Sequence, residues 1–293
     1  MTQVVANGLV NGAILALFAL SVTIIFSILR VPNFGLGGVF VWGAFLAYVV
    51  VVQLRMNFVV GAAVALVGAA LLGLVVERFA FRRLRTASEE AMFVSAIGVL
   101  IIMENAAYLV WGGDTYSMPV AGLDFRVSLG GLAFLPATRV MLLVVAACAF
   151  AGLHLLVRRS RMGKAMRAVA QDRVAASLLG IPIDRVAAST FALGSGMAGM
   201  AGALVGATFS FTSDMGGLSV LKAFVAVVLG GLGSVFGAIA GGFILGLIDS
   251  FTQTYLTSEY KQVVAFGMLI LVLAIRPAGL FGERGFRADA PRP

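Results

Sequence analysis

The feature that most constrains this chain is a series of apolar runs, many of them about 18 residues or longer, separated by short polar or glycine-rich stretches. A helix needs about 20 residues to cross the hydrocarbon core of a bilayer. The chain has 61% hydrophobic and 12% charged residues, whereas soluble globular domains carry about 25% charged residues. We therefore predict an all-α integral membrane protein, a polytopic bundle of about eight or nine transmembrane helices.

Nine apolar segments make up the predicted spans. They are residues 7–29, 39–53, 58–76, 91–111, 140–157, 186–209, 218–231, 231 to about 249, and 263–275. The glycine-rich stretch RVPNFGLGG separates the first two, and we expect this break to be packed in protein, near an interface or beside a wet cavity. Residues 218–249 are interpreted as a discontinuous helix. Together the spans predict one transmembrane domain over residues 1–285, followed by a disordered tail at 286–293.

Basic residues are concentrated at one side of the predicted bundle. Arg30, the loop after residue 76, the segment Arg158 to Arg185 and the tail hold 16 of the 21 Lys and Arg residues. The positive-inside rule places these segments in the cytoplasm, so the net charge of +8 reflects orientation and not nucleic-acid binding. A cytoplasmic tail after an outside N-terminus requires an odd number of crossings. We therefore count the short segment 218–231 as a crossing and favour nine in total.

The longest polar interruption is Arg158 to Arg185, which contains seven basic residues. Residues 164–179 lack Gly and Pro and are rich in good helix formers, so we predict one short helix there. Gly180 and Pro182 provide a double stop signal. Small side chains on this helix suit insertion into a groove of a partner protein; they are Ala165, Ala168, Ala175 and Ala176. The alternative is an ordinary positive-inside loop that only fixes orientation.

Ionisable residues inside predicted spans are costly and therefore suggest a role. Glu104, Lys222 and Asp249 are the three in this chain. Either Glu104 or Asp249 pairs with Lys222 as a structural contact, or one of the two carboxylates lines a transport pathway; we favour the structural alternative. Asn33 is expected either to satisfy backbone groups at the helix break or to contact substrate.

Other chemistry is poorly supported by the residues available. The chain has one His and one Cys, so we expect neither a metal site nor the nucleophile of an enzyme. His154 is interpreted as an interfacial residue, and Cys148 as a packing residue. There is no Walker A sequence, so an ATP-driven process would depend on a partner. A secondary transporter or channel remains an alternative, although only three ionisable residues lie within its possible path.

Four motifs in order resemble the LivH type of membrane permease subunits from ATP-binding-cassette importers for branched-chain amino acids. They are NFGLG at Asn33–Gly37, RMGKAMRAVAQDRVAASLLGI, LKAFVAVVLGGLGSVFGAIAGGFILGLID and IRPAGLFG. The resemblance covers nearly the whole chain. It departs from the family at Leu36, where relatives usually have His, so any role of that His in the pathway is absent or moved here.

The resemblance implies a function, partners and a location. The chain would be an inner-membrane, multi-pass bacterial permease that works with ATPase subunits, which bind the ATP, with a second related permease subunit or a second copy, and with a substrate-binding protein. The coupling residues toward the ATPase would be Gly163, Lys164, Arg167, Asp172, Ala176 and Gly180. We predict Asn33, Phe34, Gly37, Glu104 and Asp249 as pathway candidates. Urea or short amides are alternative substrates, because relatives with similar motifs carry them.

Overall fold

The computed structural model describes residues 1–29, 32–84, 87–120, 126–128, 134–256, 260–276 and 279–281. Its long or apolar helices are α1 (Thr2–Leu29), α2 (Leu36–Tyr48), α3 (Phe58–Val76), α4 (Glu89–Trp111), α5 (Ala137–Arg159), α8 (Ile183–Thr208), α9 (Met215–Gly230), α10 (Val235–Tyr255) and α11 (Tyr260–Ile275). Between α5 and α8 lie the short helices α6 (Arg161–Gln171) and α7 (Arg173–Leu178). The strands β1 (Arg126–Ser128) and β2 (Phe134–Pro136) form an antiparallel pair. The predicted tail at 286–293 lies outside the described residues.

The helices confirm the predicted all-α membrane fold. Seven helical segments among the described residues are long and apolar enough to span a membrane: 2–28, 36–53, 58–84, 89–111, 137–159, 183–208 and 235–255. The helices α9 and α11 have 16 residues each, which gives them a length of about 24 Å. The predicted discontinuity lies between α9 and α10, where Gly231 and Gly233 have φ of 112° and 84°. Nine crossings remain a prediction.

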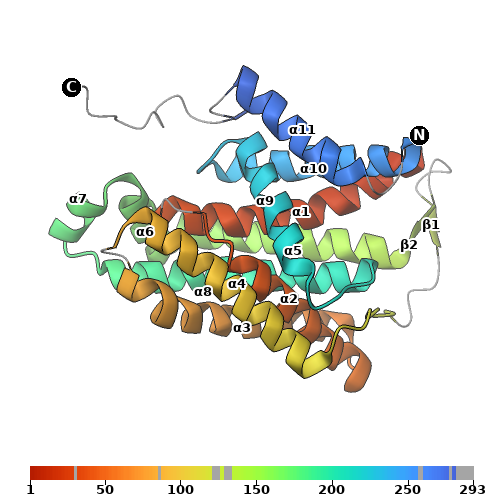
Figure 1. The fold of residues 1–293 in the computed structure, drawn as a ribbon, viewed down its shortest axis with the longest axis horizontal. Helices are drawn as coiled ribbons and strands as arrows, with labels where there is room; N and C mark the ends of the chain where they lie inside the picture. The colour runs from red at the N-terminus through yellow and green to blue at the C-terminus, as the bar shows by residue number, and fades with distance from the viewer. Residues whose placement is uncertain are drawn as a thin grey trace.

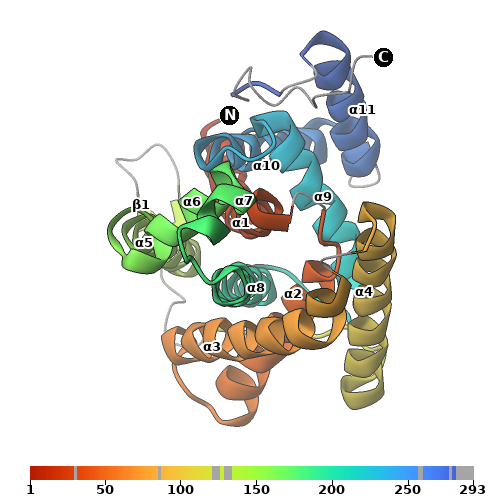
Figure 2. The same cartoon turned by 90° about the vertical axis from the view of Figure 1, so that its left-hand side faces the viewer.

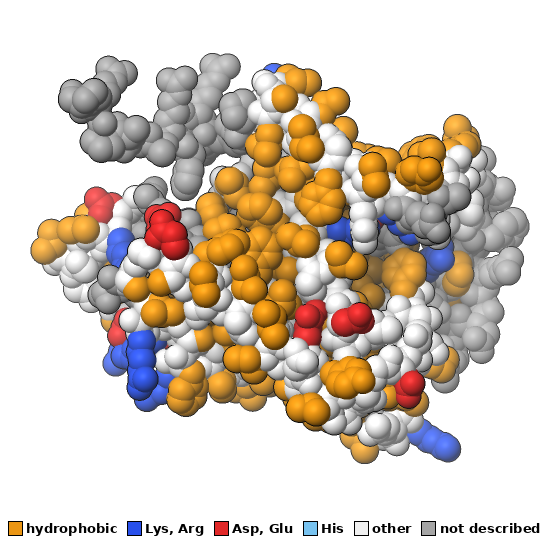
Figure 3. Space-filling model, viewed as in Figure 1, with side chains coloured by type: hydrophobic (Ala, Val, Ile, Leu, Met, Phe, Trp, Pro, Cys, Tyr) orange, Lys and Arg blue, Asp and Glu red, His pale blue; other side chains and the backbone are white. Residues whose placement is uncertain are grey.

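Two helices form the centre of the bundle. Most residues of α1 and α8 are buried, whereas few residues of α4 and α5 are. Figures 1 and 2 show α1 and α8 running side by side through the middle, with α2, α3 and α10 packed around them. Hydrophobic side chains cover the middle of the face shown in Figure 3. Such a surface is expected where helices face lipid.

Close contacts between helix backbones explain why the central helices are rich in glycine. A Cβ atom built on Gly202 of α8 would lie 2.0 Å from the carbonyl oxygen of Phe40 in α2. A Cβ on Gly199 would lie 2.2 Å from the Cβ of Ala69 in α3. Small residues let membrane helices approach this closely. The glycines of α8 therefore allow α2 and α3 to pack directly against it.

Replacing Gly202 with Ala should destabilise the bundle. The added methyl group would displace the α2 backbone, and such overpacking costs about 1–3 kcal/mol or more. Gly98→Ala in α4 is the matched control, because a Cβ there meets nothing within 4 Å. Thermal unfolding of the purified variants in detergent measures the difference. Equal stability of the two variants would contradict the tight contact between α2 and α8.

Candidate translocation and coupling sites

The segment between α5 and α8 contains two helices where one was predicted. Asp172 interrupts the segment with an extended backbone, φ −148° and ψ 111°. Its carboxylate accepts hydrogen bonds from the N–H groups of Val174 and Ala175 at 2.8 and 3.0 Å, which caps the N-terminus of α7. The prediction of a single helix over 164–179 is therefore wrong. The predicted stop is present, with Gly180 in the left-handed region at φ 78°.

Two of the predicted coupling residues hold α6 against the end of α5. A Cβ on Gly163 would lie 2.0 Å from the carbonyl oxygen of Val157, so only glycine fits this turn. The guanidinium of Arg167 donates a hydrogen bond to the same oxygen. Ser160 caps α6 by accepting from the N–H of Gly163 at 2.9 Å. Lys164 is exposed and extends from α6 into solvent.

Ala176 lies in the interior of the segment and not on its surface. It is 1% exposed and packs in a cluster with Met166, Val169 and Val186. The expectation that Ala176 enters a groove of a partner is therefore corrected, because its side chain is already enclosed by this chain. Of the other alanines in the prediction, only Ala175 is exposed; Ala165 and Ala168 are half-buried.

The exposed apolar surface of α7 was missed by the sequence reasoning. Val174, Leu178 and Leu179 are 69%, 83% and 81% exposed, at the end of the molecule where α7 projects (Figure 1). Large apolar side chains this exposed outside the spans mark a contact surface for another protein or for the membrane. The signal in the sequence was a pair of leucines at the end of a basic segment. We call Val174, Leu178 and Leu179 the α7 tip.

The break between α1 and α2 is buried and packs against the beginning of α9. Asn33 is 4% exposed, and its Oδ1 accepts a hydrogen bond from the N–H of Gly35 at 3.0 Å. The expectation that Asn33 satisfies the backbone of the break is confirmed. A Cβ on Gly37 would lie 2.6 Å from the carbonyl oxygen of Gly216, so the first turns of α2 and α9 touch.

Glu104 of α4 lies at this meeting point. Its Oε1 accepts a hydrogen bond from the N–H of Gly217 at 2.8 Å, in the first turn of α9. This contact provides the side-chain cap that Asp214, at the N-terminus of α9, does not supply. Of the two pairings considered for Lys222, the structure does not have the one with Glu104, because the described partner of Glu104 is a backbone amide.

Phe34 completes the region around the break. Its ring contacts Phe93 of α4 edge to face, at a centroid distance of 5.5 Å, and Phe224 of α9 at 5.8 Å. Four of the five pathway candidates thus belong to one region, where α2, α4 and α9 meet. We call the residues Asn33, Phe34, Gly37, Glu104, Gly216 and Gly217 the helix-break site.

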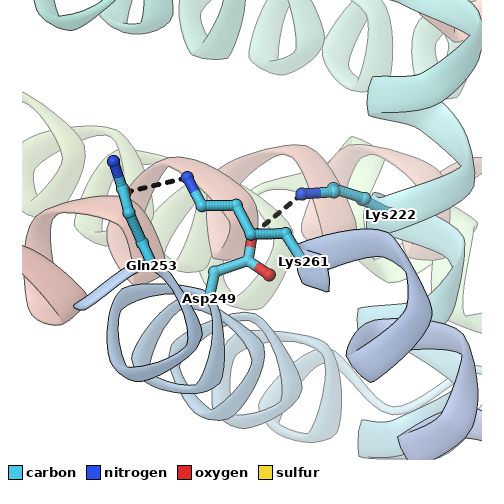
Figure 4. A network of polar contacts seen from close by, with 4 residues as sticks. All are labelled: Lys222, Asp249, Gln253 and Lys261. Carbon is cyan, nitrogen blue, oxygen red and sulfur yellow. Dashed lines mark hydrogen bonds and ion pairs between the residues drawn. The ribbon is translucent and has the colours of Figure 1, made fainter. Parts of the chain in front are cut away.

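Asp249, the fifth candidate, belongs to a separate polar cluster. Its Oδ2 forms an ion pair of 2.9 Å with Nζ of Lys222 in α9 (Figure 4). Of the two carboxylates considered for Lys222, the structure therefore selects Asp249. Lys261 of α11 lies beside this pair and donates to Oε1 of Gln253 at 2.8 Å. The second oxygen of Asp249, Oδ1, is buried and has no hydrogen-bond partner among the described residues.

The sequence of this chain is similar to those of known transport proteins. The profile of the family described as "Branched-chain amino acid transport system / permease component" matches residues 4–273. The chain is 36% identical to the high-affinity branched-chain amino acid transport system permease protein LivH of Escherichia coli K12, over 96% of this chain and 95% of that protein. It is 34% identical to BraD of Pseudomonas aeruginosa PAO1, with the same coverage of each chain.

A more distant similarity concerns a second permease. LivM of Escherichia coli K12, a permease protein of the high-affinity branched-chain amino acid transport system, is 30% identical over 54% of this chain and 38% of its own length. The family match extends from α1 to α11 and so includes the helix-break site, the polar cluster and the segment with α6 and α7. The chain is a multi-pass membrane protein that belongs to the family of branched-chain amino acid transport permease components.

Proposed function

We propose that the chain is the inner-membrane permease subunit of an ATP-binding-cassette importer, and that it moves branched-chain amino acids. The observation that carries this proposal is the family match over residues 4–273. A binding protein would deliver the substrate at the face opposite α6 and α7. A separate ATPase subunit would bind ATP and drive transport.

The α7 tip and Lys164 support the contact with the ATPase. The tip supplies apolar surface, and the exposed Lys164 of α6 can approach a carboxylate of the partner. Gly163, Arg167, Asp172, Ala176 and Gly180 act within the chain by fixing the shape of the segment. In this proposal the α7 tip and Lys164 form the docking surface. The other five residues fix the position of that surface on the chain.

A second, related permease subunit completes the assembly that we propose. The similarity to LivM, which is named as a permease of the same system as LivH, supports a heterodimer of related subunits. Purifying this chain together with candidate partners tests the arrangement. Recovery of a fully active transporter from this polypeptide alone would favour an ATPase-independent carrier instead.

The helix-break site supports an amino acid as the substrate class. The N-termini of α2 and α9 meet there. Glu104 caps α9, whereas the N-cap Gly35 of α2 supplies no side-chain cap, and a helix N-terminus favours a carboxylate. The carboxylate of Glu104 in the same region favours an ammonium group. A zwitterionic amino acid carries both charges, whereas urea and short amides carry neither. We therefore assign Glu104 to the pathway as well as to the cap of α9.

Glu104→Gln should keep the fold and reduce transport. The amide oxygen of Gln can still accept the hydrogen bond from Gly217, but the negative charge is lost. We expect uptake of leucine to fall about tenfold or more, as for the loss of one charged hydrogen bond. Glu104→Ala should in addition lower thermal stability by about 1 kcal/mol, because the cap of α9 is removed. Normal uptake by Glu104→Gln would show that Glu104 only caps α9 and takes no part in the pathway.

The substrate is tested with the reconstituted assembly. Proteoliposomes that contain both permeases and the ATPase, with the binding protein outside, should take up labelled leucine only when ATP is enclosed. Urea and acetamide should not compete for this uptake. Competition by either compound at concentrations similar to leucine would support the alternative substrate class.

A further inference from the structure

A cavity of about 700 Å³ lies between α1, α5, α6 and the beginning of α10, at the end of the molecule that carries α6 and α7. Figure 2 views the molecule from this end and shows α5, α6, α1 and α10 close together. The cavity volume is within the range of ligand-binding pockets, about 300–1,000 Å³. None of the residues that line it is acidic. It is separate from the helix-break site and from the pair of Lys222 and Asp249.

The polarity of the cavity changes along its length. On α5 the lining residues begin with Phe150 and Leu153 and end with His154 and Arg158. On α1 they begin with Leu20 and Ile24 and end with Ser27 and Ile28. Both helices run toward the basic end of the bundle, so the cavity is apolar at its membrane side and polar at its cytoplasmic side. A ligand that fits it has an apolar tail and a polar head.

The polar end of the cavity is positively charged. Arg158 and Arg167 both line it. Within the described part of the chain, the guanidinium of Arg158 has no hydrogen-bond or ion-pair partner. Arg167 uses one donor for the carbonyl oxygen of Val157, while a guanidinium has five N–H donors in all. The N-terminus of α10 adds its partial positive charge at Val235 and Phe236. An anionic head group, and phosphate above all, matches this arrangement.

We propose that this cavity binds an anionic phospholipid from the cytoplasmic leaflet. The phosphate contacts Arg158 and Arg167, and the beginning of an acyl chain lies among Leu20, Ile24 and Phe150. Basic pockets between transmembrane helices on the cytoplasmic side are suited to such lipids. The bound lipid contacts α5, α6 and α10 at the same time. It therefore stabilises the position of the segment that carries the α7 tip. This proposal does not depend on which substrate is transported.

The test measures lipid binding to the purified full-length chain in detergent. Phosphatidylglycerol and phosphatidylcholine with the same acyl chains are titrated, and thermal unfolding reports binding. Phosphatidylglycerol should raise the unfolding temperature of the parent more than phosphatidylcholine does. Arg158→Gln should weaken the apparent affinity for phosphatidylglycerol about tenfold, the effect of losing one charged hydrogen bond.

Arg159→Gln is the matched control, because Arg159 is exposed on the same last turn of α5 but does not line the cavity. It should change the affinity less than about twofold. Ala170→Phe fills the cavity from α6 and should weaken binding of phosphatidylglycerol while Arg158 remains in place. Three results would overturn the proposal. Arg158→Gln and Arg159→Gln could lose the same affinity for phosphatidylglycerol, or the two lipids could raise the unfolding temperature equally. Inorganic phosphate could also raise the unfolding temperature as much as phosphatidylglycerol does.

Discussion

Replacing Leu178 and Leu179 with Asp should abolish ATP-driven uptake while the protein still reaches the membrane. The two side chains are 83% and 81% exposed on the α7 tip, so the change leaves the packing of this chain intact. Burial of each leucine at an interface is worth about 1.5–3 kcal/mol. Loss of both should weaken association with the ATPase more than about 100-fold, and two new carboxylates oppose docking further. Co-purification of the ATPase and uptake in proteoliposomes measure both effects.

The matched control places the same charges at the opposite end of the bundle. Leu54 and Met56 are also exposed apolar residues, 62% and 49%, in the connection before α3. Leu54→Asp with Met56→Asp should leave the ATPase bound. Retention of the ATPase and normal uptake by the α7 tip variant would show that this surface is not the docking site. Ala176→Arg is unsuitable for this test, because Ala176 is buried and the variant would disrupt α7 itself.

Asp249→Asn should destabilise the bundle by about 3 kcal/mol, the lower end of the effect of removing one partner from a buried ion pair, because the side chain of Lys222 is 21% exposed. Lys222 would keep its charge within the apolar bundle without its carboxylate partner. The double variant Lys222→Met with Asp249→Leu should recover much of the lost stability, since no unpaired charge is left. Thermal unfolding of the parent, of Lys222→Met, of Asp249→Leu and of the double variant gives the coupling energy.

Lys261→Met provides the control within the same cluster. Lys261 is bonded to Gln253 and not to Asp249, so its loss should cost less than about 1 kcal/mol. If Asp249→Asn is as stable as the parent but loses uptake, Asp249 belongs to the pathway and the ion pair has no structural role. Loss of stability together with a large coupling energy confirms the structural contact between α9 and α10.

The sequence alone determined the features that depend on neighbours along the chain. Apolar runs predicted the membrane helices, because crossing a bilayer requires about 20 consecutive apolar residues whatever the tertiary structure. Gly180 predicted a helix end because a left-handed residue is needed locally. The order of four motifs along the chain was sufficient to indicate the family.

Other features were decided only by the tertiary structure. Glu104 and Asp249 were equally plausible partners of Lys222. Which of them forms the pair depends on which helices pack against α9, and on whether their carboxylates lie at the same position along α9 as Lys222. The sequence did not predict the break at Asp172, because Asp can also lie within a helix. In the folded chain the carboxylate of Asp172 caps α7, and this cap stabilises the interruption. Ala176 is suited to either a surface or an interior, and its burial depends on how α7 folds back onto α6 and α8. These outcomes depend on contacts between residues far apart in the chain, which local composition does not encode.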